Sequence, residues 1–209
     1  MRPLVRAFAQ RAADRWSTAL DRLLEIRAGD PLAEQFASFG SGSRIGHPRR
    51  LIVNPEAIAI GSDVTINPGV VLEAVHTAGE LIHIGNGCYF GFGVRIVAIN
   101  GVILDDGVAV GHGVTLADTI HDYKNAGSDE HAWQAPLKVG QPLRIEPGVW
   151  IGNNTVVAGG VTLGRGCIIG ANCSITSDVP AYTLVSGNPA VPIRRRDADG
   201  AWHRVDDEE

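Results

Sequence analysis

Apolar residues recur at every sixth position over most of the chain from residue 60 onward, a period that neither an α-helix nor simple strand alternation produces. The first positions of 15 such hexads are Ile60, Ile66, Leu72, Ile84, Phe90, Ile96, Leu104, Val110, Leu116, Ile145, Ile151, Val157, Leu163, Ile169 and Ile175. The second position is Gly in seven hexads, and the fifth is Val, Ile or Cys in 12. This self-similarity predicts a solenoid in which each hexad forms one short strand and one turn.

The hexad pattern also predicts which side chains face the interior. We expect the first and fifth positions to point inward, and Gly at the second position to supply the backbone freedom that a turn needs. Three hexads close a triangular coil of 18 residues, so 15 hexads predict five coils. Residues expected at the inward fifth position include Cys88, Ile120, Cys167 and Cys173. The cysteines are therefore interpreted as small buried hydrophobes, not as catalytic thiols.

Strict spacing fails at three places, after Leu72, Ile96 and Leu116. Each break follows the third side of a predicted coil, so the three insertions should emerge from one edge of the prism. Insertions in solenoids gather on the functional face. The longest one, residues 121–144, is the candidate active-site loop.

The N-terminal part has a different pattern. Residues 4–27 predict one amphipathic helix, and Gly29 and Pro31 follow as stop signals. Its apolar face comprises Val5, Phe8, Ala12, Trp16, Ala19, Leu20, Leu23 and Leu24. A basic amphipathic helix can lie on a membrane, but the end of a solenoid needs a cap, so we expect this helix to pack on the prism or on a neighbouring subunit. The predicted divisions are 1–43 (helix and linker), 44–182 (β-solenoid with loop 121–144) and 183–209 (C-terminal segment).

Composition narrows the function classes. The formal net charge is −5, which argues against general nucleic-acid binding. We find neither an apolar stretch of about 18 residues nor a signal-peptide core, so no integral membrane contact is expected. Three cysteines without a CxxC pair argue against a disulfide framework or a zinc site and fit a cytoplasmic location.

Several motifs within the hexads resemble those of the hexapeptide-repeat acyltransferases. They are VWIG at 149–152, GVTLG at 160–164, IGA at 169–171, DVP at 178–180 and SGNPA at 186–190. The resemblance covers about residues 44–196 and has features of the maltose/galactoside and polysaccharide O-acetyltransferases. It implies an all-β solenoid that is a left-handed parallel β-helix. It also implies a homotrimer that binds acetyl-CoA between neighbouring prisms and requires no metal.

The same resemblance implies a catalytic base at His121, the first residue of the long loop, shortly after the hexads that precede it. A sugar hydroxyl is a poor nucleophile near pH 7, and imidazole titrates in this range. His121 would remove the hydroxyl proton as the oxygen attacks the thioester carbonyl, and would return it to the CoA thiolate. Asp118, Asp122 or a backbone carbonyl would orient the ring. The other histidines considered, His76, His83, His112 and His131, are expected on the surface.

Further site residues follow from the resemblance. The backbone N–H of Asn153 would stabilise the oxyanion, Trp150 would line the acetyl-CoA cleft, and three small residues would leave room for pantetheine. The expected cofactor-binding residues are Trp150, Gly159, Gly160, Ala171, Asn188 and Arg194. In the long loop, Tyr123, Asn125 and Trp133 combine aromatic rings and an amide in a way that suits a sugar.

The chain departs from the family pattern at several positions. Gly159 stands where Pro is common, Ser177 where Lys is usual, and Val191 where a basic residue often occurs. The arginines at 165 and 194–196 are the available replacements for contacts to the CoA phosphates. Gly93 stands where the galactoside branch has Asn, which leaves the acceptor open.

The predicted function is transfer of acetyl from acetyl-CoA to a hydroxyl of a small sugar or glycan acceptor. N-acetylation of an amino sugar or other small amine is the alternative, and a non-enzymatic β-helix scaffold is a third reading. A zinc carbonic anhydrase on the same prism is disfavoured, because His112 and His121 are nine residues apart and no HxxxxH motif occurs.

Overall fold

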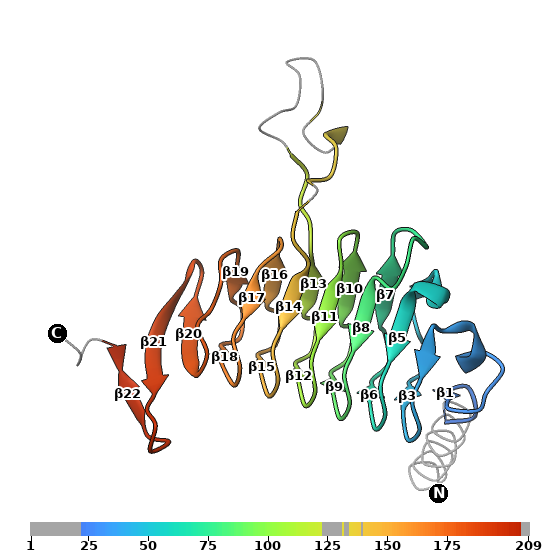
Figure 1. Ribbon diagram of the computed structural model, residues 1–209, viewed down its shortest axis with the longest axis horizontal. Coiled ribbons are helices and arrows are strands. Elements are labelled where there is room, and N and C mark those ends of the chain that lie inside the picture. The colour runs from blue at the N-terminus through green and yellow to red at the C-terminus, as the bar shows by residue number, and fades with distance from the viewer. Residues whose placement is uncertain (1–21, 123–130, 132–133, 139, 206–209) are drawn as a thin grey trace, which may run out of the picture.

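The computed structural model describes residues 22–122, 131, 134–138 and 140–205, and it is a β-solenoid (Figure 1). Short strands stack along the long axis of a prism with three faces, and each coil gives one strand to each face. The described strands form six coils, from β2–β4 to β17–β19, one more than the hexads predict. The first coil is missed because Ile45 and Ile52 are seven residues apart rather than six. The fold class predicted from the sequence, a left-handed parallel β-helix of hexapeptide repeats, is confirmed.

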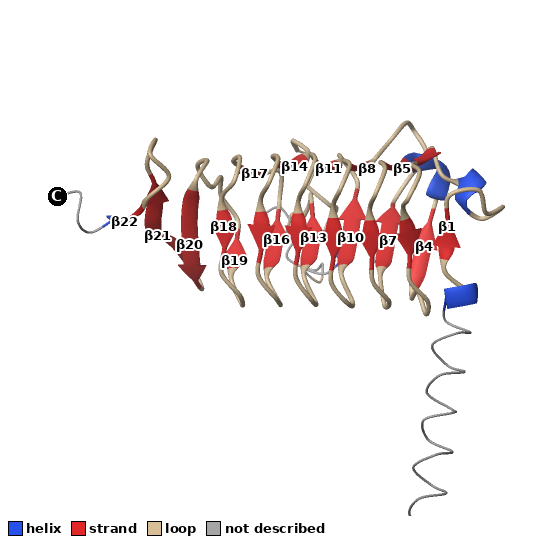
Figure 2. Ribbon diagram, turned by 90° about the horizontal axis from the view of Figure 1, so that it is seen from below, coloured by secondary structure: helices blue, strands red, loops and turns tan. Residues whose placement is uncertain are grey.

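Three sheets, which we call A, B and C, form the faces. Sheet A contains β1 (Ile26–Arg27), β3 (Arg44–Ile45), β6 (Thr65–Ile66), β9 (Tyr89–Phe90), β12 (Ala109–Val110), β15 (Trp150–Ile151), β18 (Ile168–Ile169), β20 (Thr183–Gly187), β21 (Ala190–Arg196) and β22 (Trp202–Arg204). Sheet B contains β2 (Ser38–Phe39), β5 (Ile58–Ile60), β8 (Ile82–Ile84), β11 (Val102–Leu104), β14 (Leu143–Ile145) and β17 (Thr162–Leu163). Sheet C contains β4 (Leu51–Val53), β7 (Val71–Ala74), β10 (Arg95–Ala98), β13 (Thr115–Ala117), β16 (Val156–Ala158) and β19 (Ser174–Ile175). Figure 2 shows strands of successive coils stacked side by side along the prism.

The apolar first position of each hexad forms the core, as predicted. All 15 residues are at most 3% exposed. Parallel pairing stacks them in rows, for example Ile66 beside Phe90 and Phe90 beside Val110. Burying one apolar side chain per hexad is a main source of stability in so narrow a prism.

The glycines have a different role from the one predicted. Backbone conformations with positive φ occur at the fourth hexad position, where Gly87, Gly113, Asn154 and Asn172 are examples. The second-position glycines are needed for close approach instead: a Cβ on Gly85 would lie 2.6 Å from the carbonyl carbon of Asp105. Successive coils therefore touch through their backbones at the second position, while Gly, Asn or Asp at the fourth position makes the tight turn.

The fifth position points inward in most hexads. The three cysteines are buried, and burial raises the pKa of Cys88 and raises that of Cys167 to about 12. Thr155 is also buried at this position and its hydroxyl donates to the carbonyl of Gly170 at 2.9 Å. The prediction for Ile120 is wrong: it is 45% exposed, because the chain leaves the prism after β13.

The three insertions leave the prism along one edge, as predicted. They connect β7 to β8, β10 to β11 and β13 to β14, which in each case is a passage from sheet C to sheet B. We call this the C–B edge, and Figure 1 shows the longer connections rising from it. Tight turns from sheet A to sheet C form the A–C edge, and those from sheet B to sheet A form the B–A edge.

The N-terminal cap differs from the prediction. Residues 1–21 lie outside the described residues, but the predicted helix over 4–27 is wrong at its end: Arg22 and Leu23 are helical, and β1 follows at Ile26–Arg27. Leu23 is 80% exposed, so this part of the predicted apolar face does not pack on the prism. Ile26 instead pairs antiparallel with Ile45 and is buried, together with Ala33 in the short 3-10 helix η1 (Ala33–Gln35). A second one, η2 (Pro55–Ala57), precedes β5.

The parallel ladder extends beyond residues 44–182 at both ends. At the N-terminal side β2 pairs with β5, and at the C-terminal side β20 continues sheet A beside β18. The antiparallel strands β21 and β22 then cover the last coil. Hydrogen bonds to β21 and β1 thus cover the open edges of sheet A.

Candidate functional site

His121 lies on a short two-stranded stem at the base of the long loop. It forms an antiparallel bridge with Leu137. The amide of Lys138 donates to the carbonyl of Ile120 at 2.9 Å, and the amide of Asp122 donates to that of Pro136 at 2.8 Å. The stem closes the loop directly above the C–B edge and leaves the His121 side chain exposed.

The imidazole of His121 is oriented by a backbone carbonyl. Its Nδ1 atom lies 2.7 Å from the carbonyl oxygen of Ala135, a residue that is 2% exposed. A carbonyl oxygen can only accept, so Nδ1 carries the hydrogen and Nε2 of the neutral ring is left with a free lone pair. This is the tautomer that a general base requires. Of the three orienting groups considered from the sequence, the structure selects the backbone carbonyl.

Asp118 has another task. It is buried, and its carboxylate accepts backbone N–H groups from Ile99, Asn100 and Gly101. These three residues form the preceding connection at the C–B edge. Asp118 therefore fixes the backbone beside which the long loop begins, a role that the hexad pattern does not reveal.

A cavity of about 300 Å³ opens beside the stem. Its lining includes Lys138 and Gln141 from the end of the loop, with Gly159 and Gly160 from the turn after β16. Gly159 has φ +89°, and a Cβ on Gly160 would overlap the carbonyl of Gln141. Both predicted cofactor glycines therefore line a real cavity, although the local backbone also requires them. Lys138, a cationic residue that also lines this cavity, lies outside the hexads and is not among the residues predicted from the sequence.

A second group of predicted residues lies on sheet A and along the A–C edge. Trp150 is on β15 and is 55% exposed, and Asn153 is in the turn that follows. Ala171 occupies the equivalent turn after β18, and Asn188 follows β20. These positions are adjacent at the C-terminal half of the prism.

Arg194 belongs to the same sheet. Trp150 pairs with Ile168, Ile168 with Leu184, and Leu184 with Arg194. Trp150 and Arg194 thus lie in one row across sheet A, with two apolar residues between them. A guanidinium at the end of an apolar row suits a ligand that has an extended arm and a phosphate.

The predicted residues are therefore divided between two edges of one chain. His121, Gly159 and Gly160 lie at the C–B edge, whereas Trp150 and Asn153 lie on sheet A or the A–C edge. Sheet C separates the two groups. Tyr123, Asn125 and Trp133 lie outside the described residues.

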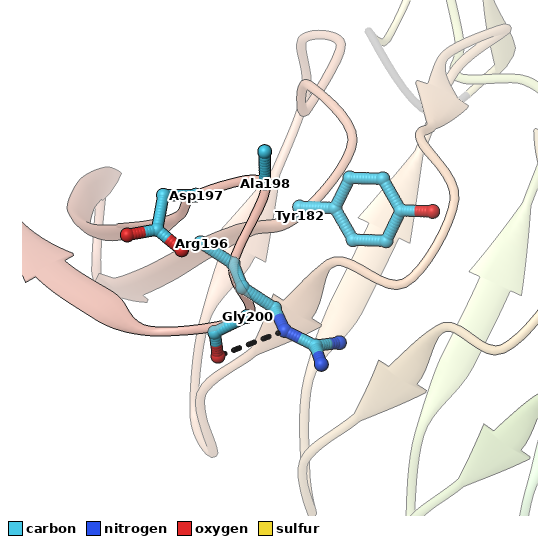
Figure 3. A pocket seen from close by; sticks show the side chains of 5 residues that line it. All are labelled: Tyr182, Arg196, Asp197, Ala198 and Gly200. Carbon is cyan, nitrogen blue, oxygen red and sulfur yellow. Dashed lines mark hydrogen bonds between the residues drawn. The ribbon is translucent and has the colours of Figure 1, made fainter.

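Another cavity, of about 370 Å³, lies at the C-terminal end of the prism (Figure 3). Tyr182, Arg196 and Asp197 are among the residues that line it, and the Arg196 Nε donates to the carbonyl of Gly200 at 3.2 Å. A hydrogen bond from His203 holds the pKa of Asp197 below its usual value. Arg196, one of the arginines considered for the CoA phosphates, lines this cavity, whereas Arg194 does not appear among its lining residues.

The described residues contain neither a metal-type cluster nor a membrane-spanning helix. Within 22–122, 131, 134–138 and 140–205, no three His, Cys, Asp or Glu side chains gather in a way that could hold a metal ion. In the same part of the chain, no helix has the length and apolar character needed to span a bilayer.

Comparison with known proteins gives several relatives. The family described as bacterial transferase hexapeptide (six repeats) matches residues 142–177. A putative acetyltransferase of Schizosaccharomyces pombe is 32% identical over 56% of this chain, which spans only 54% of that protein. The galactoside O-acetyltransferase of Escherichia coli is 29% identical over 70% of this chain and 68% of its own length. The putative colanic acid biosynthesis acetyltransferase WcaF of Escherichia coli is 30% identical over 66% of this chain and 69% of its own.

Solved structures agree on the fold. A mutant of the N-acyltransferase AntD from Bacillus cereus, in complex with dTDP and coenzyme A, superposes with a TM-score of 0.69 at 19% identity, over 82% of this chain and 91% of that one. Hexad repeats, buried first positions and relatives that share two thirds of their length converge on one assignment. The chain belongs to the family of bacterial hexapeptide-repeat transferases.

Proposed function

We propose that this protein transfers an acetyl group from acetyl-CoA to a hydroxyl of a sugar or glycan, with His121 as the general base. The observation that carries the proposal is the hydrogen bond between His121 Nδ1 and the Ala135 carbonyl, which leaves Nε2 free to accept a proton. The relatives support the substrate class, because one is a galactoside O-acetyltransferase and another is assigned to colanic acid biosynthesis.

The chemistry is a direct transfer. The acceptor hydroxyl oxygen forms a bond to the thioester carbonyl carbon while its proton passes to His121 Nε2. The carbon–sulfur bond then breaks, the acetyl group remains on the acceptor oxygen, and the departing thiolate takes the proton from His121. The backbone N–H of Asn153 is proposed to stabilise the negative charge on the carbonyl oxygen between these steps.

A single chain does not bring the two groups of residues together, so the proposed site requires a second copy. Small and apolar residues face outward on sheet C, among them Val97, Ala117 and Ala158, which pair in adjacent strands. If sheet C faces a threefold axis, the A–C edge of one chain meets the C–B edge of the next. We therefore propose a homotrimer whose shared cleft combines Asn153 and Trp150 of one chain with His121 of its neighbour.

The residues present fit acetyl-CoA as the donor substrate. Gly159, Gly160 and Ala171 offer little side chain to block a pantetheine arm on either wall of this cleft. Trp150 presents an exposed ring, and Arg194 supplies charge for a phosphate.

The experiment is acetyl transfer from acetyl-CoA to a panel of sugars and amino sugars, followed by thiol release and by the mass of the product. An O-acetylated sugar supports the proposal, exclusive N-acetylation replaces it with the amine alternative, and no transfer to any acceptor overturns it. Light scattering of Ala117→Glu tests the assembly, because a new charge between Val97 and Ala158, away from the existing Arg95–Glu73 ion pair of sheet C, should abolish both the trimer and turnover. Ile103→Glu is the matched control, since Ile103 faces outward on sheet B between His83 and Arg144, and we expect a carboxylate between these two side chains to leave the fold intact.

A further inference from the structure

His112 lies in the turn after β12 at the A–C edge, the edge that carries Asn153. Its Nδ1 accepts the backbone N–H of Phe92 from the preceding coil at 2.9 Å. Its own backbone N–H donates to the Asn153 side-chain oxygen, at 2.8 Å, in the following coil. His112 is thus one step in a ladder in which each third-position side chain satisfies the backbone of the coil before it.

Elsewhere in the prism this task is performed by shorter side chains. At the B–A edge, the Asn86 side-chain oxygen accepts the N–H of Ser62 at 2.8 Å, and that of Asp106 accepts the N–H of Asn86 at 2.7 Å. One acceptor atom is enough for the ladder, so capping alone does not require an imidazole. The second ring nitrogen of His112 is an additional group.

The ladder fixes what that second nitrogen can do. Because Nδ1 accepts a hydrogen bond, it carries no proton, and Nε2 of the neutral ring carries the hydrogen. The hydrogen bonds of the described residues give Nε2 no partner, and the side chain is exposed. His112 therefore presents a fixed donor, the reverse of the tautomer that Ala135 imposes on His121.

An aromatic ring lies directly beside this donor. Phe92 is 53% exposed and stacks on the His112 ring, with centroids 5.4 Å apart and planes inclined by 23°. An exposed aromatic ring offers an apolar surface to the C–H face of a pyranose, and an adjacent N–H can donate to a sugar oxygen. Neither group has a task in the core.

We propose that Phe92 and His112 form the binding surface for the acceptor sugar, with Phe92 against the ring face and the His112 Nε2–H donating to a sugar oxygen. This inference rests on the proposed function, because the trimer brings the A–C edge of one chain to the His121 of its neighbour. One imidazole then holds the acceptor and the other removes its proton.

The test uses a substitution that the ladder itself suggests. His112→Asn keeps an oxygen acceptor for the Phe92 N–H, as Asn86 does for Ser62, but removes the Nε2–H donor. We expect the KM for the acceptor to rise about tenfold or more, the effect of losing a hydrogen bond to the ligand. The KM for acetyl-CoA, the trimer and the melting temperature should remain unchanged. Asn86→His is the matched control: it places an imidazole on the equivalent step of the remote B–A edge, and acceptor kinetics should not change.

Phe92→Leu provides a second variant, because it keeps the backbone N–H of the ladder and removes only the aromatic surface. We expect it to raise the acceptor KM as well, and it decides the matter if His112→Asn fails to assemble. This inference alone is overturned if the wild type transfers acetyl and the variants that assemble have acceptor KM values within twofold of wild type. Absence of wild-type transfer to any sugar overturns both the inference and the proposed function.

Discussion

The Nδ1 atom of His121 is held 2.7 Å from the carbonyl oxygen of Ala135, a residue 14 positions further along the chain. The two partners stand on opposite strands of the stem, so the long loop must close before the ring is aimed. The pairing at the base of the loop therefore determines the orientation of the proposed base.

Removing the proposed base should lower turnover and leave the binding of acetyl-CoA nearly unchanged. His121→Ala is expected to lower kcat by about 10²–10⁴-fold, the usual contribution of a positioned general base. The affinity for acetyl-CoA, measured by calorimetry, should change little, because the proposed contacts to it lie at other residues. His83→Ala, which removes an exposed histidine of sheet B, is the control and should retain activity. Near-normal turnover of His121→Ala on the true acceptor would contradict the assignment.

How much of this site the sequence could predict depends on the kind of contact. The fold was predictable because residues such as Ile96 and Leu116 repeat one inward position, and the C–B edge was predictable because insertions keep the register of the coils. The hydrogen bond from His121 to the Ala135 carbonyl was not predictable, because every residue has a backbone carbonyl. Only closure of the loop brings the carbonyl of Ala135 next to the imidazole.

The caps of the prism illustrate the same limit. Ile26 belongs to a strand of two residues, too short to produce a period, and its burial depends on pairing with Ile45. The separate roles of Gly85 and Gly87 could not be predicted for a related reason. The sequence shows glycine at both positions, but only the three-dimensional structure shows that Gly85 closely approaches the next coil whereas Gly87 has a positive φ.

Substitution should lower the stability of the protein at Gly85 but not at Gly87. Gly85→Ala would place a Cβ 2.6 Å from the carbonyl carbon of Asp105, so we expect a loss of roughly 1–3 kcal/mol of stability or more, as in other overpacked sites. Gly87→Asn should be tolerated, because Asn adopts positive φ and Asn154 already does so at the same hexad position. Thermal unfolding of both variants measures the difference. Equal destabilisation would refute the separation of the two roles.

Cys167 should make stability depend on alkaline pH. Burial raises the pKa of its thiol to about 12 in the folded protein, whereas an unfolded cysteine titrates at about 8.5. The folded state disfavours the thiolate, so the contribution of this group is complete below the unfolded pKa and is lost as the pH rises from there towards 12.

Cys167→Val tests this linkage, because Val149 occupies the equivalent inward position one coil earlier. Between about pH 8.5 and 11 the variant should lose less stability than the wild type in denaturant titrations. Alkylating reagents should label Cys167 only after unfolding. Rapid labelling of the folded protein at neutral pH would show that the thiol is accessible and would contradict the buried role.

The N-terminal cap distinguishes two neighbouring residues. Ile26 is 3% exposed and pairs with Ile45, whereas Leu23 is 80% exposed. Ile26→Ala should therefore lower the free energy of unfolding by about 2–4 kcal/mol, and Leu23→Ala should change it by no more than about 0.5 kcal/mol. A large effect of Leu23→Ala in the assembled protein would instead mean that the segment packs on a neighbouring subunit.

Because β1 is part of sheet A, we expect capping rather than membrane attachment, and the full-length protein should not sediment with anionic vesicles at physiological salt. If the wild type does sediment with the vesicles, and Leu23→Ala abolishes this binding without changing stability, the apolar surface that includes Leu23 binds a membrane.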